Sequence, residues 1–193
     1  MSWSSSMAPV PADVVDVYLS TGEFHFGGGQ TRIRTVLGTC VAITLWHPQR
    51  RLGGMCHYML PARSPVAAKA QHVHGLYADE ALELFRRDLI ATRTQPRDYV
   101  VKIFGGGNMF AGARQAGNAC QHKLCAAADR LRCHDVACKN VQTAHDLLIQ
   151  HGYSVTSQSV GGYGCRQVVF DVWSGDVWVR RGPPLQCGAA ASA

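Results

Sequence analysis

Residues 35–63, TVLGTCVAITLWHPQRRLGGMCHYMLPAR, constrain the fold more than any other stretch of this chain. Two apolar runs flank the polar break HPQRR, and this pattern predicts an antiparallel β-hairpin. Residues that oppose each other in such a hairpin have positions that sum to a constant. With the turn centred between Pro48 and Gln49, Cys40 faces His57 on one side of the hairpin, with Cβ atoms about 5 Å apart. The pattern therefore predicts a thiol beside an imidazole, at the end of the hairpin away from the turn.

A thiol next to an imidazole is a candidate nucleophile. A thiol of ordinary pKa, about 8.5, is only slightly ionised at neutral pH, and a neighbouring imidazole can take its proton. Gly38, just before the thiol, lets a substrate backbone approach closely. Thr35 lies upstream on the same strand and is a candidate to orient the histidine through its hydroxyl. Spacing alone is equally compatible with a buried cysteine that neighbours a histidine by chance.

Strands dominate the rest of the chain. We expect further strands over 14–26, 98–107, 153–162, 166–175 and 176–182. Helices are expected over 140–152, ending at Gly152, and over 76–92, where apolar residues recur at near-helical spacing. The apolar residues of the 76–92 segment are Leu76, Ala81, Leu82, Leu84, Phe85 and Leu89. These elements predict one α/β domain over 14–181: a layered sandwich of mostly antiparallel strands, with two or three helices packed on one or both sheet faces. The tails 1–13 and 182–193 are expected to be disordered.

Composition places the chain among globular proteins and outside several other classes. Its 193 residues are 47% hydrophobic and 17% charged, and the net charge is +6. The positive charges are scattered, and we find no nucleic-acid-binding motif. The first basic residue is Arg32, so we expect no secretory signal, and no run of 18 apolar residues predicts a membrane span. We therefore expect a cytoplasmic protein whose eight cysteines are mostly free thiols.

A series of motifs accompanies the hairpin in order along the chain. They are LGTCVAI, GGMCHYMLP, YADEAL, KIFGGGNMF, CKN, VGGYGCRQVVFD and GDVWVRR. Together they resemble the CheD family, the chemoreceptor glutamine deamidases, over residues 15–181. The chain departs from the family pattern in VACKN, where Ala137 and Lys139 replace glycine and arginine, and in GGYGCR, which lacks an asparagine. Cys56 beside His57 is also unusual, and on a strand it should face the opposite way.

The resemblance implies a fold related to bacterial toxin deamidases, a Cys–His hydrolase that acts on carbon–nitrogen bonds of linear amides, and no cofactor. Cys40 would be the nucleophile, His57 its base and Thr35 the residue that completes the site. Gly38, Thr39 and Asn108 would contact the substrate. The implied substrates are glutamine side chains in the cytoplasmic helices of methyl-accepting chemotaxis receptors, which become methylatable glutamates. Some members of the family bind a CheC-type phosphatase, so such a phosphatase is a second candidate partner.

Two other functions remain open from the sequence. The fold could serve as a non-catalytic module that docks a receptor or a CheC-type phosphatase. A small zinc protein is the other alternative, because cysteines and histidines cluster in one segment, although without a CxxC pair. The members of that cluster are Cys120, His122, Cys125, Cys133, His134 and Cys138. Scattered free thiols are the simpler interpretation, as are a tight turn for FGGGN at 104–108 and an exposed loop for His72 and His74.

Overall fold

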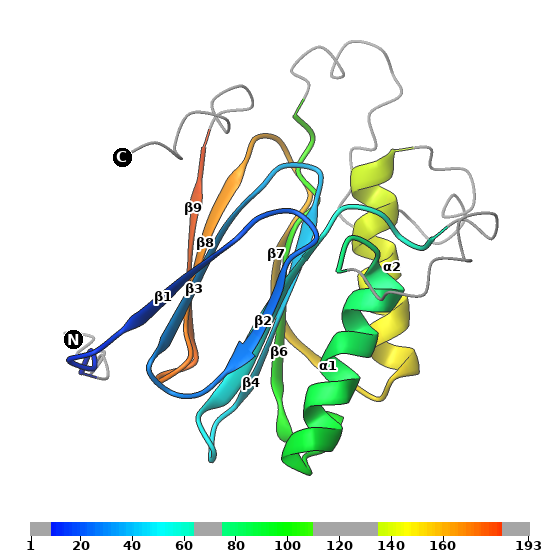
Figure 1. Cartoon of the computed structure of the whole chain (residues 1–193). Helices are drawn as coiled ribbons and strands as arrows, with labels where there is room; N and C mark the ends of the chain where they lie inside the picture. The colour runs from blue at the N-terminus through cyan, green and yellow to red at the C-terminus, as the bar shows by residue number, and fades with distance from the viewer. Residues whose placement is uncertain (1–8, 64–74, 110–134, 183–193) are drawn as a thin grey trace, which may run out of the picture.

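The computed structural model describes residues 9–63, 75–109 and 135–182, which form three layers. A four-stranded sheet packs against a five-stranded sheet, and two helices cover the other face of the five-stranded sheet (Figure 1). This arrangement confirms the expected α/β sandwich. Within the described ranges the helices lie on one sheet face, so the alternative of helices on both faces does not apply to them.

The two sheets are mixed but mainly antiparallel. The four-stranded sheet has the order β1-β3-β8-β9, with β1 (Val15–Leu19), β3 (Thr31–Leu37), β8 (Arg166–Asp171) and β9 (Asp176–Arg181). The five-stranded sheet has the order β2-β5-β4-β6-β7, with β2 (Phe24–Gly27), β4 (Val41–His47), β5 (Leu52–Tyr58), β6 (Val100–Gly105) and β7 (Val155–Val160). The β1–β3 and β6–β7 pairings are parallel, and the other pairings of these nine strands are antiparallel, as expected.

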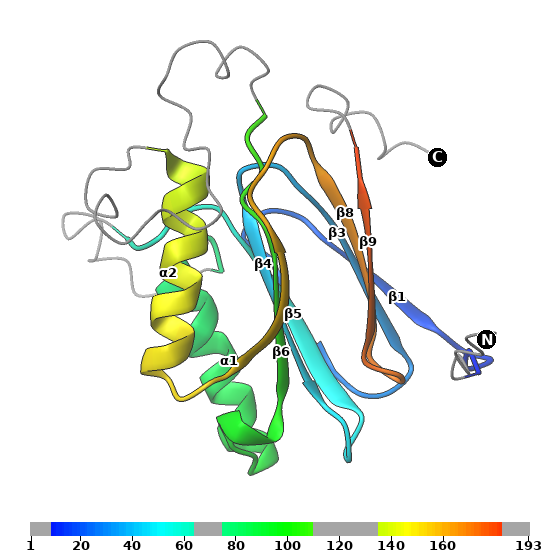
Figure 2. The same cartoon turned by 180° about the vertical axis from the view of Figure 1, so that it is seen from behind.

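Helices α1 (Ala78–Thr92) and α2 (Val136–Gln150) pack beside each other on the five-stranded sheet (Figure 2). A short 3-10 turn, η1 (Pro96–Asp98), connects α1 to β6. The buried residues of α1 are Ala78, Ala81, Leu82, Phe85 and Leu89. The 3.6-residue period of the apolar positions therefore located α1 correctly, although Leu76 precedes the helix. Helix α2 begins four residues earlier than expected, because the Asp135 side chain caps it and accepts from the Ala137 N–H at 2.9 Å.

Strand β5 divides its side chains between two hydrophobic cores, because successive side chains of a strand point to opposite faces. Cys56 and Tyr58 are fully buried in the core between the five-stranded sheet and the helices. Met55 is buried in the other core, between the two sheets. His57 therefore points into the space between the sheets, and Cys56 faces away from it, as predicted.

The segment expected to form one strand over 14–26 instead forms two strands in different sheets. Strand β1 belongs to the four-stranded sheet and β2 to the five-stranded sheet. Between them the chain reverses at Gly22, whose φ of +86° lies in the left-handed region. The Glu23 N–H closes the turn by donating to the Ser20 carbonyl oxygen at 3.0 Å. The expectation of one continuous strand is wrong because it ignored this turn.

The hairpin of β4 and β5 forms as expected, but in a different register. Ala42, rather than Cys40, lies opposite His57. The connection has four residues instead of two, and Arg51 closes it with a φ of 50° and an N–H bond to the His47 carbonyl oxygen at 2.9 Å. The predicted register is therefore wrong by two positions. A shift of two keeps each side chain on its face, so Cys40 and His57 become diagonal neighbours on the same side.

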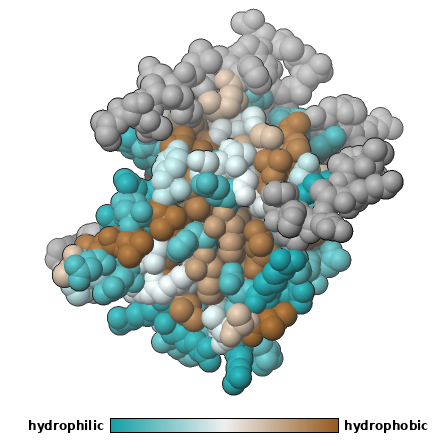
Figure 3. Space-filling view, viewed as in Figure 1, coloured by the Kyte–Doolittle hydropathy of each residue, from teal (hydrophilic) through white to brown (hydrophobic). Residues whose placement is uncertain are grey.

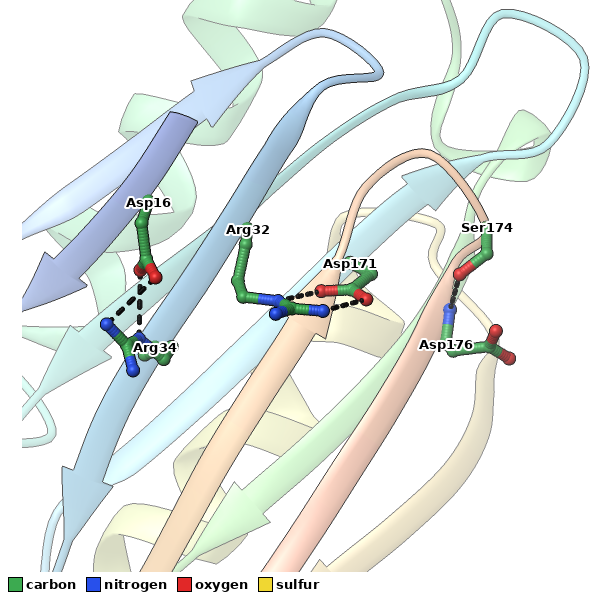
Figure 4. A network of polar contacts seen from close by, with 6 residues as sticks. All are labelled: Asp16, Arg32, Arg34, Asp171, Ser174 and Asp176. Atoms are coloured by element: carbon green, nitrogen blue, oxygen red, sulfur yellow. Dashed lines mark hydrogen bonds and ion pairs between the residues drawn. The ribbon is translucent and has the colours of Figure 1, made fainter. Parts of the chain in front are cut away.

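The outer face of the four-stranded sheet carries two cross-strand ion pairs. Arg32 on β3 binds both carboxylate oxygens of Asp171 on β8, at 2.6 and 2.7 Å (Figure 4). The Arg32 guanidinium also lies over the Trp173 ring, 5.2 Å from its centroid. Arg34 pairs with Asp16 on β1 at 2.8 Å. On the face shown in Figure 3, hydrophobic residues reach the surface in patches that hydrophilic residues separate.

The ordered elements extend from Val15 to Arg181, close to the limits expected for the domain. Most of the two expected tails, 1–8 and 183–193, lies outside the described residues, so their disorder stays a prediction. No helix in the described part of the chain is long and apolar enough to cross a membrane.

Candidate active site

Cys40 is the last residue of the connection between β3 and β4, at the upper end of the sandwich in Figure 1. The β1–β2 connection, the end of β6 and the β7–β8 connection gather at the same end, whereas the β4–β5 turn lies at the opposite end. The Cys40 side chain is half-buried and free. The thiol therefore lies where several connections meet, away from the hairpin turn, as expected.

His57 lies between the two sheets and is only 3% exposed. Its Nδ1 is 2.8 Å from Thr35 Oγ1, which is in turn 2.8 Å from the Leu19 carbonyl oxygen. Because a carbonyl oxygen only accepts, the Thr35 hydroxyl donates to Leu19 and accepts from Nδ1–H. The second ring nitrogen, Nε2, is then unprotonated and can accept a proton. Thr35 thus occupies the orienting position that the sequence analysis expected.

Thr21 lies in the β1–β2 turn, on the other side of the imidazole. Its Oγ1 is 3.4 Å from His57 Nε2, and its hydroxyl also acts on the Cys40 thiol as a hydrogen-bonding group. Two backbone bonds fix the turn against His57: Gly22 N–H to the His57 carbonyl oxygen at 2.7 Å, and His57 N–H to the Glu23 carbonyl oxygen at 3.0 Å. The sequence analysis missed Thr21, although the Thr-Gly pair is a turn signal that would have located it.

Burial shifts the thiol and the imidazole in opposite directions. It raises the pKa of the Cys40 thiol above its ordinary value, while the hydroxyls of Thr21 and Thr39 and the backbone N–H of Cys40 partly offset the rise. Burial also lowers the pKa of His57 below 6.5, against the opposing effects of the Leu19 carbonyl and the Glu23 carboxylate. Both shifts favour the neutral form. The resting site therefore holds a thiol and a neutral imidazole instead of an ion pair.

Cys56 has a different environment, although it adjoins His57 in sequence. It is fully buried against the helices, and this burial raises the pKa of its thiol to about 12. A thiol with that pKa is not ionised at neutral pH. Because Cys56 is fully buried, solvent also cannot reach its thiol. Cys56 is therefore a core residue, and Cys40 is the candidate nucleophile.

Three consecutive glycines at the end of β6, Gly105 to Gly107, hold the Cys40 connection in place. The Gly106 N–H donates to the Cys40 carbonyl oxygen, and the Gly107 N–H donates to the Gly38 carbonyl oxygen, both at 2.8 Å. Gly105 has a φ of +110°, and a Cβ there would overlap the Cys40 carbonyl oxygen. The expectation of a tight turn over 104–108 is wrong, because Phe104 and Gly105 end β6 and the chain then runs to a bridge between Asn108 and Tyr163 without a turn. The glycines allow the backbone to lie close to the Cys40 connection.

Asn140 on α2 connects the two strands that carry the candidate catalytic residues. The side chain is fully buried, and its Nδ2 donates to the carbonyl oxygens of Thr39 at 3.2 Å and Met59 at 2.7 Å. Met59 follows β5, and Thr39 precedes Cys40. Asn140 belongs to the CKN motif, which the sequence analysis matched without assigning it a role. Lys139, one of the departures from the family pattern, is exposed on the outer side of the helix.

The three residues expected to contact substrate all lie near the thiol. The Thr39 hydroxyl lowers the pKa of the Cys40 thiol and so partly offsets the effect of burial. A Cβ on Gly38 would lie 3.1 Å from the Met109 side chain, so Gly38 is needed for packing as well as for access. Asn108 follows Gly107, and its N–H donates to the Gly162 carbonyl oxygen at 2.8 Å. Their contact with substrate remains a prediction.

A cleft lies beside Thr21. It has a volume of about 430 Å³ and lies between the β1–β2 turn and the segments that flank α1's start. Its lining residues are Thr21, Gly22, Glu23, Arg63, Leu76 and Tyr77. Arg63 pairs with Glu80 at 2.5 Å and lies over the Tyr77 ring, 4.7 Å from its centroid. The cleft thus presents an aromatic and charged wall beside the β1–β2 turn that carries Thr21.

The described residues contain no cluster of three or more histidine, cysteine or acidic side chains that could hold a metal ion. Cys138, one of the residues considered as zinc ligands, lies on α2 and is not disulfide-bonded. Cys165 is disulfide-bonded, so the expectation of free thiols holds for three of the four described cysteines. The remaining candidate ligands lie outside the described residues: Cys120, His122, Cys125, Cys133 and His134. His72 and His74 lie outside them as well.

Comparison with known proteins gives a consistent family. A family model described as CheD chemotactic sensory transduction matches residues 59–181. A protein of Pseudomonas fluorescens (strain SBW25) named probable chemoreceptor glutamine deamidase CheD is 44% identical over 173 residues, which cover 90% of this chain and 88% of the relative.

Two further relatives are less similar in sequence. Probable chemoreceptor glutamine deamidase CheD 3 of Dechloromonas aromatica (strain RCB) is 42% identical over 175 residues, covering 90% of this chain and 91% of the relative. A relative in Leptospira interrogans, probable chemoreceptor glutamine deamidase CheD 1, is 34% identical over 171 residues, or 89% of this chain and 95% of the relative. The similarity therefore extends over nearly the whole length of each protein.

Proposed function

This chain belongs to the CheD family, and from that membership and the geometry of its site we propose that it is a protein-glutamine deamidase. It converts glutamine side chains of methyl-accepting chemotaxis receptors to glutamate and releases ammonia. The reaction is a hydrolysis of a linear amide carbon–nitrogen bond. The observation that carries the proposal is the series from the Leu19 carbonyl through Thr35 to His57 Nδ1, because it leaves Nε2 unprotonated and able to accept a proton.

The first half-reaction forms a thioester. The Cys40 proton passes to His57 Nε2, and the sulfur attacks the carboxamide carbon, so that a carbon–sulfur bond forms and negative charge collects on the oxygen. The Cys40 backbone N–H, which lies beside its own sulfur, is the proposed donor to this oxyanion. The intermediate then collapses, the carbon–nitrogen bond breaks, and the His57 imidazolium donates its proton to the departing ammonia.

The second half-reaction hydrolyses the thioester. Water enters where ammonia left, gives one proton to His57 Nε2 and attacks the acyl carbon. The carbon–sulfur bond breaks, the proton returns from His57 to Cys40, and the product is a glutamic acid side chain, which ionises at neutral pH. The cycle restores both groups to their starting protonation states and consumes one water for each ammonia released, so it needs no cofactor.

Substrate recognition is proposed to use the end of the sandwich where Cys40 lies. Gly38, Thr39 and Asn108 would contact the glutamine side chain, and the neighbouring cleft would accept residues that flank it on the receptor helix. The net charge of +6 favours association with acidic receptor helices. This proposal places the protein in the cytoplasm, where such helices are found, and leaves a CheC-type phosphatase as a further candidate partner.

Ammonia release distinguishes this function from its alternatives. The purified protein would be incubated with a folded cytoplasmic receptor fragment and with free glutamine, and the fragment's mass would be followed. We expect ammonia and a gain of about one mass unit per site with the fragment only. Comparable turnover of free glutamine would indicate a small-molecule amidase. Binding of the fragment without any mass change would indicate the non-catalytic module.

Ionic strength tests the electrostatic part of the recognition. Screening shortens the Debye length from about 10 Å at 0.1 M salt to about 3 Å at 1 M. We therefore expect kcat/KM for the receptor fragment to fall with salt, mainly through slower association. Salt-independent kcat/KM would leave the deamidase assignment in place but remove charge from the account of recognition.

A further inference from the structure

The ladder between β4 and β5 does not hold the nucleophile itself. At the end near the thiol, the last pair of the ladder joins Val41 to Tyr58. Cys40 precedes this pair and belongs to the connection between β3 and β4. Groups outside the ladder therefore decide how the backbone around the thiol is oriented.

Three successive carbonyl groups of this connection accept hydrogen bonds from other parts of the chain. The outer two, those of Gly38 and Cys40, accept from backbone N–H groups at the end of β6, both at 2.8 Å. The middle one, that of Thr39, accepts from a side chain, Asn140 Nδ2 on α2, at 3.2 Å. The orientation of the peptide group between Thr39 and Cys40 thus depends on one asparagine.

The Asn140 side chain joins this connection to the chain that follows β5. Its Nδ2 also donates to the Met59 carbonyl oxygen, at 2.7 Å. Both partners are carbonyl oxygens, which only accept, so the atom that faces them is the amide nitrogen, and each of its two hydrogens serves one partner. The side chain is fully buried. Asn140 therefore fixes the Cys40 connection against the strand of His57 just beyond the end of the ladder.

Peptide planarity carries the effect of this bond to the N–H of the nucleophile. The peptide bond between Thr39 and Cys40 is trans, and in a trans peptide the C=O and the following N–H point in opposite directions. Because the Thr39 carbonyl points toward Asn140, the Cys40 N–H points away from α2. Among the described residues, no backbone carbonyl accepts from this N–H. The N–H is thus oriented by its neighbour and is open to a ligand.

We propose that Asn140 is a positioning residue that orients the Cys40 backbone N–H toward the oxyanion. This inference rests on the proposed function, in which Cys40 is the nucleophile. The N–H and the sulfur of one residue are joined through Cα and Cβ, so the oxygen of a carboxamide that the sulfur attacks lies within reach of the N–H. Without the Asn140 bond the peptide group can rotate, and the charge on that oxygen loses its donor. Asn140 itself exchanges no proton with the substrate.

Two reactions of the same thiol separate this role from a general effect on the site. Deamidation places negative charge on the amide oxygen, whereas the displacement of iodide from iodoacetamide by the sulfur forms no oxyanion. Loss of the oriented N–H should therefore slow the first reaction and spare the second. Trypsin releases residues 35–50 as one peptide whose single cysteine is Cys40, so mass spectrometry can follow alkylation at this thiol alone.

Asn140→Ala removes the donor to Thr39. We expect kcat for ammonia release from the receptor fragment to fall about tenfold or more, since loss of one oxyanion donor costs about 100- to 1000-fold. KM should stay within about threefold, because the interaction is made only in the transition state. The alkylation rate of Cys40 at pH 7 should also stay within about threefold of the parent rate, since it follows the thiolate. Equal kcat in variant and parent would overturn the proposal. An equal loss in both reactions would overturn it too, because the thiol itself would then be displaced.

Tyr58→Phe is the matched control for the contact between helix and sheet. The buried Tyr58 hydroxyl donates to the backbone carbonyl oxygen of Asn140 at 2.6 Å. Its loss weakens the attachment of α2 to β5 but keeps the bond from the Asn140 amide to Thr39. We expect a lower Tm and a kcat within about twofold of the parent value, since one buried hydrogen bond is lost. A kcat loss as large as that of Asn140→Ala would contradict the proposal, because any loosening of α2 would then have the same effect.

Hydrogen exchange in the unmodified protein tests the contact even if Asn140→Ala does not fold. In NMR spectra, the side-chain N–H protons of Asn140 should exchange far more slowly than those of Gln150, which is exposed on the same helix. Equal exchange of the two side chains would overturn the proposal. An unmodified protein that releases no ammonia from any receptor fragment would instead overturn the proposed function, whereas ammonia release that survives in Asn140→Ala overturns only the role of Asn140.

Discussion

Strand β3 contributes one residue to each of two polar clusters that differ in charge and in the side of the sheet on which they lie. Thr35 points inward, where it joins His57 and the Leu19 carbonyl in a group that carries no charge at rest. Arg32, three residues earlier, points outward and forms a fully charged pair with Asp171. On β3 (Thr31–Leu37), Arg32 lies near the start of the strand and Thr35 lies nearer the end that leads to Cys40.

The difference shows what burial allows each cluster to do. In the charged pair, both carboxylate oxygens of Asp171 have a guanidinium donor, so the pair has little left to offer a ligand. Between the sheets, burial disfavours charge on both Cys40 and His57, and among the described residues Nε2 has one hydrogen-bonding neighbour, the Thr21 hydroxyl, at 3.4 Å. The outward cluster is therefore expected to support stability, and the inward cluster to support chemistry. Substitutions can test whether the two roles are separate.

The largest expected effect is the loss of the thiol. Cys40→Ala should abolish ammonia release and leave the fold intact, because the void is small and half-exposed. Cys56→Ala is the matched control in the core. It should keep its activity and lose about 1 kcal/mol of unfolding free energy, measured by denaturant titration. Ammonia release by Cys40→Ala would assign the nucleophile to another residue.

Loss of the imidazole should have the next largest effect. His57→Gln should lower kcat for ammonia release by about 100-fold or more, since general base catalysis contributes at least that much.

The pH dependence of kcat/KM in the unmutated protein tests the same imidazole. A protonated imidazole cannot accept the Cys40 proton, and the pKa of His57 is lowered, so kcat/KM of the parent should hold as pH falls to 6.5 and drop only below it. An acid limb centred above 6.5 would contradict the buried, neutral imidazole.

Loss of the orienting hydroxyl should cost less. Thr35→Val removes one hydrogen bond to Nδ1, worth about 1–2 kcal/mol, so kcat/KM should fall about tenfold. Thr35→Ser keeps the hydroxyl and should recover most of the activity. A Thr35→Val protein with full activity would show that Nδ1 needs no partner and would remove Thr35 from the site.

The charged cluster should show the reverse pattern. Asp171→Asn leaves the Arg32 guanidinium without its carboxylate, and we expect a loss of about 1–3 kcal/mol of unfolding free energy with unchanged kcat per folded molecule. Asp16→Asn breaks the exposed pair with Arg34 on the same strand and should cost about 0.5 kcal/mol or less. A change in kcat for Asp171→Asn in folded protein would show that the two clusters are coupled.

Local patterns predicted much of this structure. The apolar period of α1, the hairpin and the opposite orientations of Cys56 and His57 follow from spacings within a few residues. The placement of Cys40 and His57 on one side survived the error in register, because a two-residue shift preserves the face. The error itself came from the turn, where Arg51 adopts a left-handed conformation that glycine or asparagine would have signalled more clearly.

Contacts between segments that lie far apart in the sequence could not be predicted from such local spacings. Thr21 and Asn140 approach the site from a turn and from a helix, and no periodicity links either of them to Cys40. The division of residues 14–26 between two sheets likewise depends on the partner that each half pairs with, β3 for one and β5 for the other. Such pairings are decided by tertiary packing instead of by local propensity.

The hydrogen bond that His57 Nδ1–H donates to Thr35 joins one sheet to the other, and this has a consequence for the order of folding. Thr35 is held in a sheet whose strands β8 and β9 are the last to be synthesised, so the pair depends on contacts of long sequence separation, which form slowly. We expect a nascent chain to carry Cys40 as an ordinary thiol until its C-terminal strands have docked. Brief alkylation at successive times during refolding should then show the reactivity of Cys40 changing together with the final folding phase. The thiol would acquire its catalytic environment only in fully folded molecules.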